Sequence, residues 1–231
     1  PGFEGAIMLS AESALKSGAG IINIFSLSGN VQNILEKRPE YMVLSKVDDL
    51  KKFFEKKITI IAGPGTTNYS RLNEILEIIY NDETNLVLDA ACIEIVKSKK
   101  FSSLPIITPH EGEAAKLLGI NVDEISNKRE YYAQKISDKF SVITVLKGYE
   151  TIITDGNEIY ICKDGDSSLA FAGSGDILAG LIGSFLAQGA KRIDSCLLGV
   201  SLHAYSATNS KLKRGLTANE LIDLIRKNLN Q

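Results

Sequence analysis

The chain has 231 residues, of which 44% are hydrophobic and 23% are charged, and its net charge is −2. These values are typical of a globular domain with a large core, and the charge balance speaks against a nucleic-acid partner. No apolar run is long enough to span a membrane, so we expect no membrane partner and a cytoplasmic protein. The three cysteines lie far apart without a C-x-x-C pair, which favours buried, reduced thiols over a metal site.

Short apolar runs alternate with helical patterns over the first two thirds of the chain. An apolar stripe predicts a helix over Gly5–Lys16, and later helices are expected at Arg71–Tyr80 and from Glu111 onward. The predicted strands are Ile21–Phe25, Ile58–Ala62, Asn85–Asp89, Pro105–Thr108 and Ser141–Leu146. Strands that are apolar throughout are buried on both faces, as in a parallel sheet covered by helices. The alternation therefore predicts a layered α/β domain.

The second half of the chain departs from this alternation. Thr151–Thr154 and Glu158–Cys162 are β-like runs around Asp155-Gly156-Asn157, which predicts a hairpin. The last third is predicted to be helical over Asp176–Gln188, Ile193–Lys211 and Ala218–Leu229. No linker or internal repeat divides the chain, so we expect one domain over residues 1–231.

The loops that follow the strands are the first place to look for a ligand site, because open parallel sheets bind ligands beyond the carboxyl ends of their strands. Gly173-Ser174-Gly175-Asp176 opens a helix. Its glycines let backbone N–H groups converge near the positive end of the helix dipole, which favours an anion. Asp176 would then suit a base that deprotonates a hydroxyl group. The alternative is that Asp176 only stabilises the start of the helix.

Other strand-end loops carry polar or glycine-rich sequences, and each has a plainer explanation. His110, in Thr108–Glu113, could contact a substrate or only cap its helix. Lys147 could meet a nucleotide phosphate or be a solvated lysine before a turn. Gly63-Pro64-Gly65 could bring backbone close to a ligand or form an ordinary turn. His203 lies in an apolar helix, and we expect it to be a packing residue.

Taken in order, these motifs resemble the ADP/ATP-dependent NAD(P)H-hydrate dehydratase family, a branch of the ribokinase-like superfamily. The resemblance covers nearly the whole chain. Its motifs are Gly5-Ala6, Ser17-Gly18-Ala19-Gly20, Arg38-Pro39-Glu40, Gly63-Pro64-Gly65, Leu88-Asp89-Ala90, Thr108-Pro109-His110-Glu111-Gly112-Glu113, Leu146-Lys147-Gly148, Ala172-Gly173-Ser174-Gly175-Asp176 and Gly199-Val200 with Leu202-His203. It implies a ribokinase-like fold with a mainly parallel central sheet flanked by helices.

The resemblance also implies a repair reaction. Hydrated NADH or NADPH (NADHX, NADPHX) would return to NAD(P)H after ADP or ATP, usually with Mg²⁺, phosphorylates its hydroxyl group and the phosphate leaves. Asp176 would be the base and would also contact the substrate. The implied nucleotide-binding residues are Lys147, Gly148, Tyr149, Glu150, Thr151, Gly173, Ser174 and Gly175, and the implied substrate contacts are Ala6, Gly65 and His110. We see no dedicated metal site, and we expect a homo-oligomer.

The chain departs from the family pattern at several positions. Glu111 stands where the family often has Pro, and Asp89–Glu94 lacks an Asp and an Asn that the family commonly has there. The family's first strand would precede Pro1, so we expect the chain to lack it. One alternative is a ribokinase-like kinase of a small vitamin alcohol, of the hydroxyethylthiazole or hydroxymethylpyrimidine type. Another is a catalytically silent nucleotide-binding protein.

Overall fold

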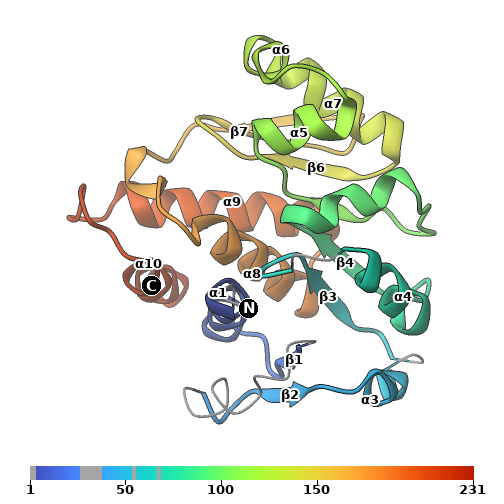
Figure 1. Ribbon diagram of the computed structural model, residues 1–231. Coiled ribbons are helices and arrows are strands. Elements are labelled where there is room, and N and C mark those ends of the chain that lie inside the picture. Colours follow the sequence, from blue (N-terminus) through green and yellow to red (C-terminus); the bar gives the residue numbers. More distant parts are fainter. Residues whose placement is uncertain (1–3, 27–37, 54–55, 67–68) are drawn as a thin grey trace.

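The computed structural model describes residues 4–26, 38–53, 56–66 and 69–231. Its centre is a six-stranded sheet in the order β3-β4-β5-β6-β7-β8 (Figure 1). The strands are β3 (Thr59–Ala62), β4 (Asn85–Leu88), β5 (Ile106–Ile107), β6 (Ile143–Leu146), β7 (Thr151–Thr154) and β8 (Ile159–Cys162). β3 to β6 are parallel, whereas β7 and β8 run antiparallel to their neighbours. The mainly parallel sheet and the hairpin at its edge are both confirmed.

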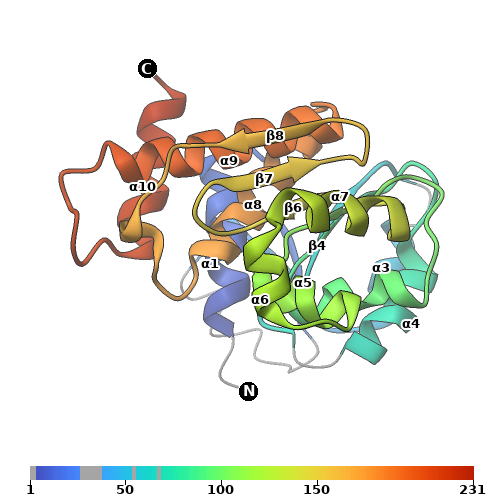
Figure 2. The same ribbon diagram turned by 90° about the horizontal axis from the view of Figure 1, so that it is seen from above.

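Helices cover both faces of this sheet. One face is covered by α4 (Tyr69–Ile79), η2 (Ala90–Lys97), α5 (Glu111–Leu118), α6 (Val122–Asn127) and α7 (Arg129–Phe140). The other is covered by α8 (Ser174–Ala187) and α9 (Arg192–Thr208). Successive side chains of a strand point to opposite faces, so Leu86 and Leu88 enter the first core and Val87 the second. Figure 2 shows the sheet between these layers.

A further layer lies behind α8, where α1 (Glu4–Lys16) and α10 (Ala218–Leu229) pack side by side (Figure 1). Helices α1 and α8 approach very closely, since a methyl group added at Gly180 would lie 2.2 Å from the Ser10 carbonyl oxygen. The Ser13 hydroxyl donates to the Ile177 carbonyl at 2.8 Å. A small parallel sheet of β1 (Asn23–Phe25) and β2 (Met42–Leu44) packs on the far side of α1.

The predicted elements are present, and the differences lie mostly at their ends. Ser141 was expected to begin a strand, but with a φ of 54° it ends α7, and β6 begins at Ile143. Helix α7 was not predicted, because its sequence is mostly polar and buries only Ala133, Ile136 and Ser137. The prediction also missed β2, η2, α6 and the short elements α3 (Val47–Leu50), η1 (Lys51–Phe53) and η3 (Ser167–Leu169).

Cys92, Cys162 and Cys196 are free thiols, and Cys92 and Cys196 are buried. Within the residues that the structure describes, no helix combines the length and the hydrophobicity needed to cross a membrane.

Candidate active site

The carboxyl ends of β4, β5 and β6 meet at one buried carboxylate. Asp89 follows β4, and its side chain is only 4% exposed. It accepts a hydrogen bond from Thr108 Oγ1 at 2.6 Å and another from Lys147 Nζ at 2.8 Å. Thr108 follows β5 and Lys147 follows β6, so parallel strands bring the three side chains together. The sequence around Asp89 departs from the family pattern at residues 89–94, and no local motif indicates the role of Asp89 in this network.

Lys147 reaches from the end of β6 toward the start of α8. Its side chain is 20% exposed, and a methyl group added at Gly175 would lie 3.2 Å from Lys147 Nζ. Glu113 Oε2 lies 3.8 Å away on the other side. The ammonium group therefore stands between carboxylates and the glycine turn, which we define as residues 173–175. This position contradicts the alternative of a solvated surface lysine.

The glycine turn begins α8 in the manner that an anion site requires. Gly173 has a φ of 99° and precedes the first helical residue, Ser174. This φ favours glycine, and a methyl group at Gly173 would lie 2.4 Å from Leu9 Cδ1 of α1, so any larger residue would also have to displace the Leu9 side chain. Backbone N–H groups in the first turn of a helix have no partner within the helix and favour negative charge.

Asp176 lies in the first turn of α8, beside the glycine turn. Burial, the largest cause, and the nearby charge of Asp89 together raise the pKa of this carboxyl group to about 6, and the charge of Lys147 opposes the shift. A carboxylate that only stabilised a helix start through backbone hydrogen bonds would have a lowered pKa. The raised pKa therefore favours the interpretation of Asp176 as a base over that of a capping residue.

His203 of α9 lies directly beneath the glycine turn. Its Nε2 is 3.1 Å from the Ser174 carbonyl oxygen and 3.4 Å from Ser174 Oγ. Burial lowers the pKa of His203 to about 4, so the ring is neutral at physiological pH and can donate Nε2–H to the carbonyl. The expected packing role of this residue is confirmed, and the structure adds that it packs against the turn.

His110 is the N-cap of α5, and its side chain is 60% exposed. Its Nδ1 accepts from the Glu113 backbone N–H at 3.3 Å, and Glu113 Oε2 accepts from the His110 N–H at 2.8 Å. The structure thus shows the capping role directly. A contact between His110 and a substrate stays a prediction, and Glu113, which bonds His110 and lies near Lys147, places the histidine at the rim of the same site.

The remaining predicted residues lie around this centre. The Gly63-Pro64-Gly65 turn follows β3, and a methyl group at Gly63 would lie 1.9 Å from the Asp89 carbonyl oxygen. Gly65 is exposed with a φ of 73°, which glycine adopts readily. Ala6 precedes Leu9 by one helical turn, on the part of α1 that contacts the glycine turn.

The expected nucleotide loop, residues 147–151, connects β6 and β7. The Lys147 N–H donates to the Pro109 carbonyl at 2.8 Å, which ties this loop to residues 108–113. Together with the position of Lys147 Nζ, this bond brings the nucleotide loop, the glycine turn and the His110 loop to one place.

The residues present also fit a magnesium ion that arrives with phosphates. Among the described residues, no group of three or more His, Cys, Asp and Glu side chains could hold a metal. Mg²⁺ usually keeps several waters and binds one or two carboxylates plus substrate phosphates, so it needs no such group. Asp89 and Asp176 lie close enough for their charges to interact, and together they could supply that role.

The fold and the site define a ribokinase-like α/β protein. A ribokinase-like superfamily protein from Enterococcus faecalis has the same fold with a TM-score of 0.88 at 23% identity, covering 99% of this chain and 83% of that one. A family model described as NAD(P)H-hydrate dehydratase matches residues 1–228. The chain belongs to this family, and the resemblance found in the sequence is confirmed.

Individual relatives agree with the family match. The chain is 33% identical over 237 residues to the bifunctional NAD(P)H-hydrate repair enzyme Nnr of Vibrio cholerae, covering 99% of the chain and 48% of that protein. It is 32% identical over 229 residues to the ADP-dependent (S)-NAD(P)H-hydrate dehydratase of Neisseria meningitidis, covering 94% and 76%. The chain thus spans about half the length of the bifunctional relatives that it matches.

Solved structures allow a comparison of the chain with the two kinds of enzyme that the sequence suggested, a dehydratase and a vitamin kinase. An ADP/ATP-dependent NAD(P)H-hydrate dehydratase from Bacillus subtilis, co-crystallised with ATP/Mg²⁺, matches with a TM-score of 0.85 at 25% identity, covering 97% of this chain and 84% of that one. A hydroxyethylthiazole kinase from Pyrococcus horikoshii shares the fold with a TM-score of 0.68 at 15% identity. The similarity to the dehydratase is therefore greater in both sequence and structure.

Proposed function

We propose that the chain returns hydrated NADH and NADPH to NAD(P)H in a reaction that consumes ADP or ATP. The observation that carries this proposal is the position of Asp176, a carboxyl group of raised pKa beside the glycine turn and within the influence of Lys147 and Asp89. Family membership supports the choice of substrate, and the relatives' dependence on ADP or ATP supports the choice of phosphoryl donor.

In this mechanism, the oxygen of the substrate hydroxyl group attacks the terminal phosphorus of the nucleotide. Asp176 accepts the proton of that hydroxyl group as the attack proceeds. A new P–O bond forms, and the bond from phosphorus to the remaining nucleotide breaks. The C–O bond of the phosphorylated ring then breaks, its electron pair leaves with the phosphate, and the adjacent ring carbon loses a proton to water, so that the C–H electrons form the restored double bond. The helix N-terminus and Lys147 offset the charge on the phosphoryl oxygens.

The other assigned residues hold the two reactants. Residues 147–151, with the glycine turn, would bind the nucleotide, and Ala6, Gly65 and His110 would contact the hydrated dinucleotide. Mg²⁺ bound to the phosphates would neutralise part of their charge, with Asp89 and Asp176 as nearby carboxylates. Since Asp89 already bonds Lys147 and Thr108, a direct metal bond would compete with these partners.

Recovery of 340 nm absorbance from hydrated NADH, measured with ADP and with ATP, tests the proposal. We expect turnover with at least one nucleotide, and the Asp176→Asn variant serves as the inactive control. Phosphorylation of hydroxyethylthiazole or hydroxymethylpyrimidine without dehydration would instead identify a vitamin kinase. Nucleotide binding without turnover of either substrate class would identify a silent binding protein.

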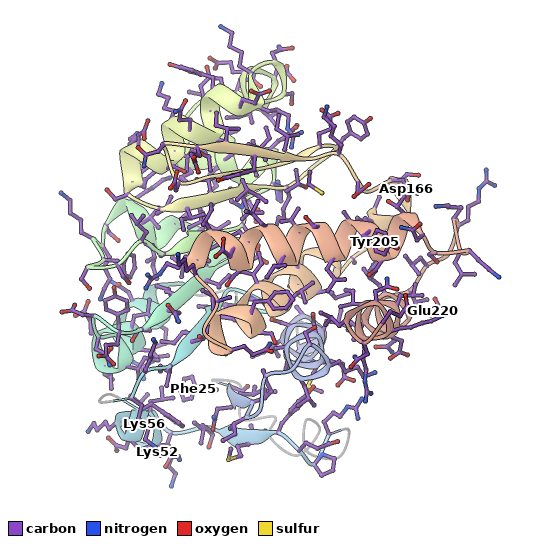
Figure 3. All side chains as sticks on the ribbon, turned by 180° about the vertical axis from the view of Figure 1, so that it is seen from behind. Phe25, Lys52, Lys56, Asp166, Tyr205 and Glu220 are labelled. Atoms are coloured by element: carbon purple, nitrogen blue, oxygen red, sulfur yellow. The ribbon has the colours of Figure 1, made fainter. Side chains whose placement is uncertain are left out.

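We also propose that the chain acts in the cytoplasm as a homo-oligomer. Helix α9 supports the second part, because Leu198 and Tyr205 are each about half exposed on it, and Figure 3 shows where Tyr205 lies on this helix. Residues seven positions apart share one face of a helix, and apolar side chains that gather on an exposed face favour contact with another subunit. Sedimentation equilibrium should give a mass above that of one chain, and Leu198→Glu with Tyr205→Glu should reduce it. A monomer at all concentrations would refute this part.

A further inference from the structure

We infer that Arg129 is a positioning residue that shapes residues 147–151 for nucleotide binding, and that its ion pair with Glu111 couples this loop to the His110 loop. The inference rests on the proposed function only in treating residues 147–151 as a nucleotide site. Neither Arg129 nor Glu111 was assigned a role by the sequence patterns.

The guanidinium group of Arg129 donates hydrogen bonds to several backbone carbonyl groups of the loop. Arg129 begins α7, well before the loop in sequence. Its Nη1 donates to the carbonyl oxygens of Tyr149 and Glu150, the latter at 3.1 Å, and its Nη2 lies 3.3 Å from those of Leu146 and Lys147. The Gly148 carbonyl accepts from Thr151 Oγ1 at 3.1 Å. The carbonyls of residues 146–150 thus all accept hydrogen bonds from side chains.

The direction of these carbonyls fixes the direction of the N–H groups. In a planar trans peptide the C=O of one residue and the N–H of the next point in opposite directions, and the described residues contain no cis peptide. With the Lys147 and Tyr149 carbonyls turned toward Arg129, the N–H groups of Gly148 and Glu150 point away from it. Backbone N–H groups that project from the same side of a turn can donate together to an anion. The guanidinium group therefore presents backbone donors to a phosphate.

The loop conformation depends on the guanidinium group in a second way. Gly148 has a φ of 147°, and a methyl group there would lie 2.7 Å from Arg129 Nη2. Glu150 has a φ of 56°, in the left-handed region that a residue with a side chain adopts only at an energetic cost. The hydrogen bonds from Arg129 to the carbonyls on either side offset that cost and hold the strained backbone.

Glu111 connects Arg129 and the nucleotide loop to the His110 loop, which is the proposed substrate contact. Its Oε1 lies 3.0 Å from Arg129 Nε in an ion pair, and its Oε2 accepts from Ser126 Oγ at 2.6 Å. Glu111 directly follows His110, at the position where the family often has Pro. Because a proline could not form this ion pair, the link between the two loops depends on the glutamate of this chain.

The test compares nucleotide affinity with substrate kinetics. Isothermal titration with ADP should show a Kd about 10-fold or more higher for Arg129→Met, because the variant loses several hydrogen bonds from a charged donor. Arg129→Lys, with a compact ammonium group, should recover only part of the loss. The Michaelis constant for hydrated NADH at saturating nucleotide should rise by a smaller factor than the Kd for ADP, because the substrate side is reached only through the ion pair with Glu111. Glu111→Gln, which removes the ion pair but keeps the carbonyl contacts, should raise the Kd about two- to fivefold.

Arg71→Met is the matched control, since Arg71 lies on α4 and pairs with Glu74. It should leave the ADP Kd unchanged. An ADP Kd within twofold of the parent in folded Arg129→Met would overturn the inference. If that variant does not fold, an unchanged Kd in both Arg129→Lys and Glu111→Gln would overturn it instead. A parent that binds ADP but does not dehydrate hydrated NADH refutes the proposed function alone, because the Kd comparison needs no turnover.

Discussion

Lys147 Nζ lies 2.8 Å from Asp89 Oδ1, in an ion pair that joins the ends of β4 and β6 across the strand between them. Thr108, at the end of that intervening strand, donates to the same carboxylate. The pair acts on Asp176 in opposite directions, since the charge of Asp89 raises the pKa of Asp176 and that of Lys147 lowers it. The buried pair therefore helps to set the pKa of Asp176, the base of the proposed reaction.

The first prediction follows from that adjustment. A base must be unprotonated to act, so kcat/KM for hydrated NADH should rise with pH through about 6 and then level off. Asp89→Asn should move the midpoint to lower pH, because it removes a negative charge, and Lys147→Met should move it to higher pH. Initial rates between pH 5 and 8 provide the measurement. A profile that is flat over this range would count against Asp176 as the base.

The second prediction concerns Asp176→Asn, which should lower kcat about 10²- to 10⁴-fold while nucleotide affinity stays equal or improves. The variant should also be more stable at pH 8. The pKa of Asp176 is about 6 in the folded protein and 3.8 for the free group, so ionisation destabilises the folded state fully above pH 6 and not at all below pH 3.8.

We expect the stability gain of Asp176→Asn to be about 1–2 kcal/mol at pH 8, after allowance for solvent screening of a partly exposed group. It should vanish as the pH falls toward 4. Urea unfolding at both pH values measures the difference. Activity within about threefold of the parent would leave Asp176 without a catalytic role, whatever the stability result.

The third prediction separates the two roles of His110. His110→Ala removes both the cap of α5 and any substrate contact, so it should cost about 1 kcal/mol of stability and raise the KM for hydrated NADH more than it lowers kcat. His110→Asn keeps a good capping residue but removes the imidazole ring. It should restore stability without restoring KM. If His110→Asn also restores KM, the histidine acts only as a cap.

The fourth prediction compares two helical glycines. Gly180→Ala places a methyl group 2.2 Å from the Ser10 carbonyl oxygen and should destabilise the protein by about 1–3 kcal/mol as α1 moves away. Gly5→Ala, in α1 with nothing within 4 Å of the added carbon, should instead stabilise it by up to about 1 kcal/mol. Thermal unfolding of both variants tests the pair, and similar shifts would contradict the close packing of α1 on α8.

The sequence patterns were sufficient where the signal is local. Continuous apolar runs indicate buried strands. Glycines indicate the turns at Gly63 and Gly173, and both residues have positive φ angles. The hairpin at Gly156 was found for the same reason. Helix α7 was not predicted, because it buries too few residues to give a clear apolar stripe.

The links between distant residues could not be predicted in this way. The ion pair of Asp89 with Lys147 depends on strand order, which brings together residues that are 58 positions apart. The contact of Arg129 with the nucleotide loop depends in the same way on where α7 packs. The position of Asp89 at a strand end and its match to the family motif Leu88-Asp89-Ala90 both pointed to this residue, but the altered sequence after it, at residues 91–94, argued against a role for the loop.

The hydrogen bond between Ser13 and Ile177 has a consequence for how the protein is made. Its partners are 164 residues apart, and at synthesis rates of about 5–20 residues per second the second emerges roughly 10–30 s after the first. During that time α1 has no α8 to cover its apolar side. The contact between α1 and α8 that supports the glycine turn therefore forms only after synthesis has passed α8, so this part of the site is completed late.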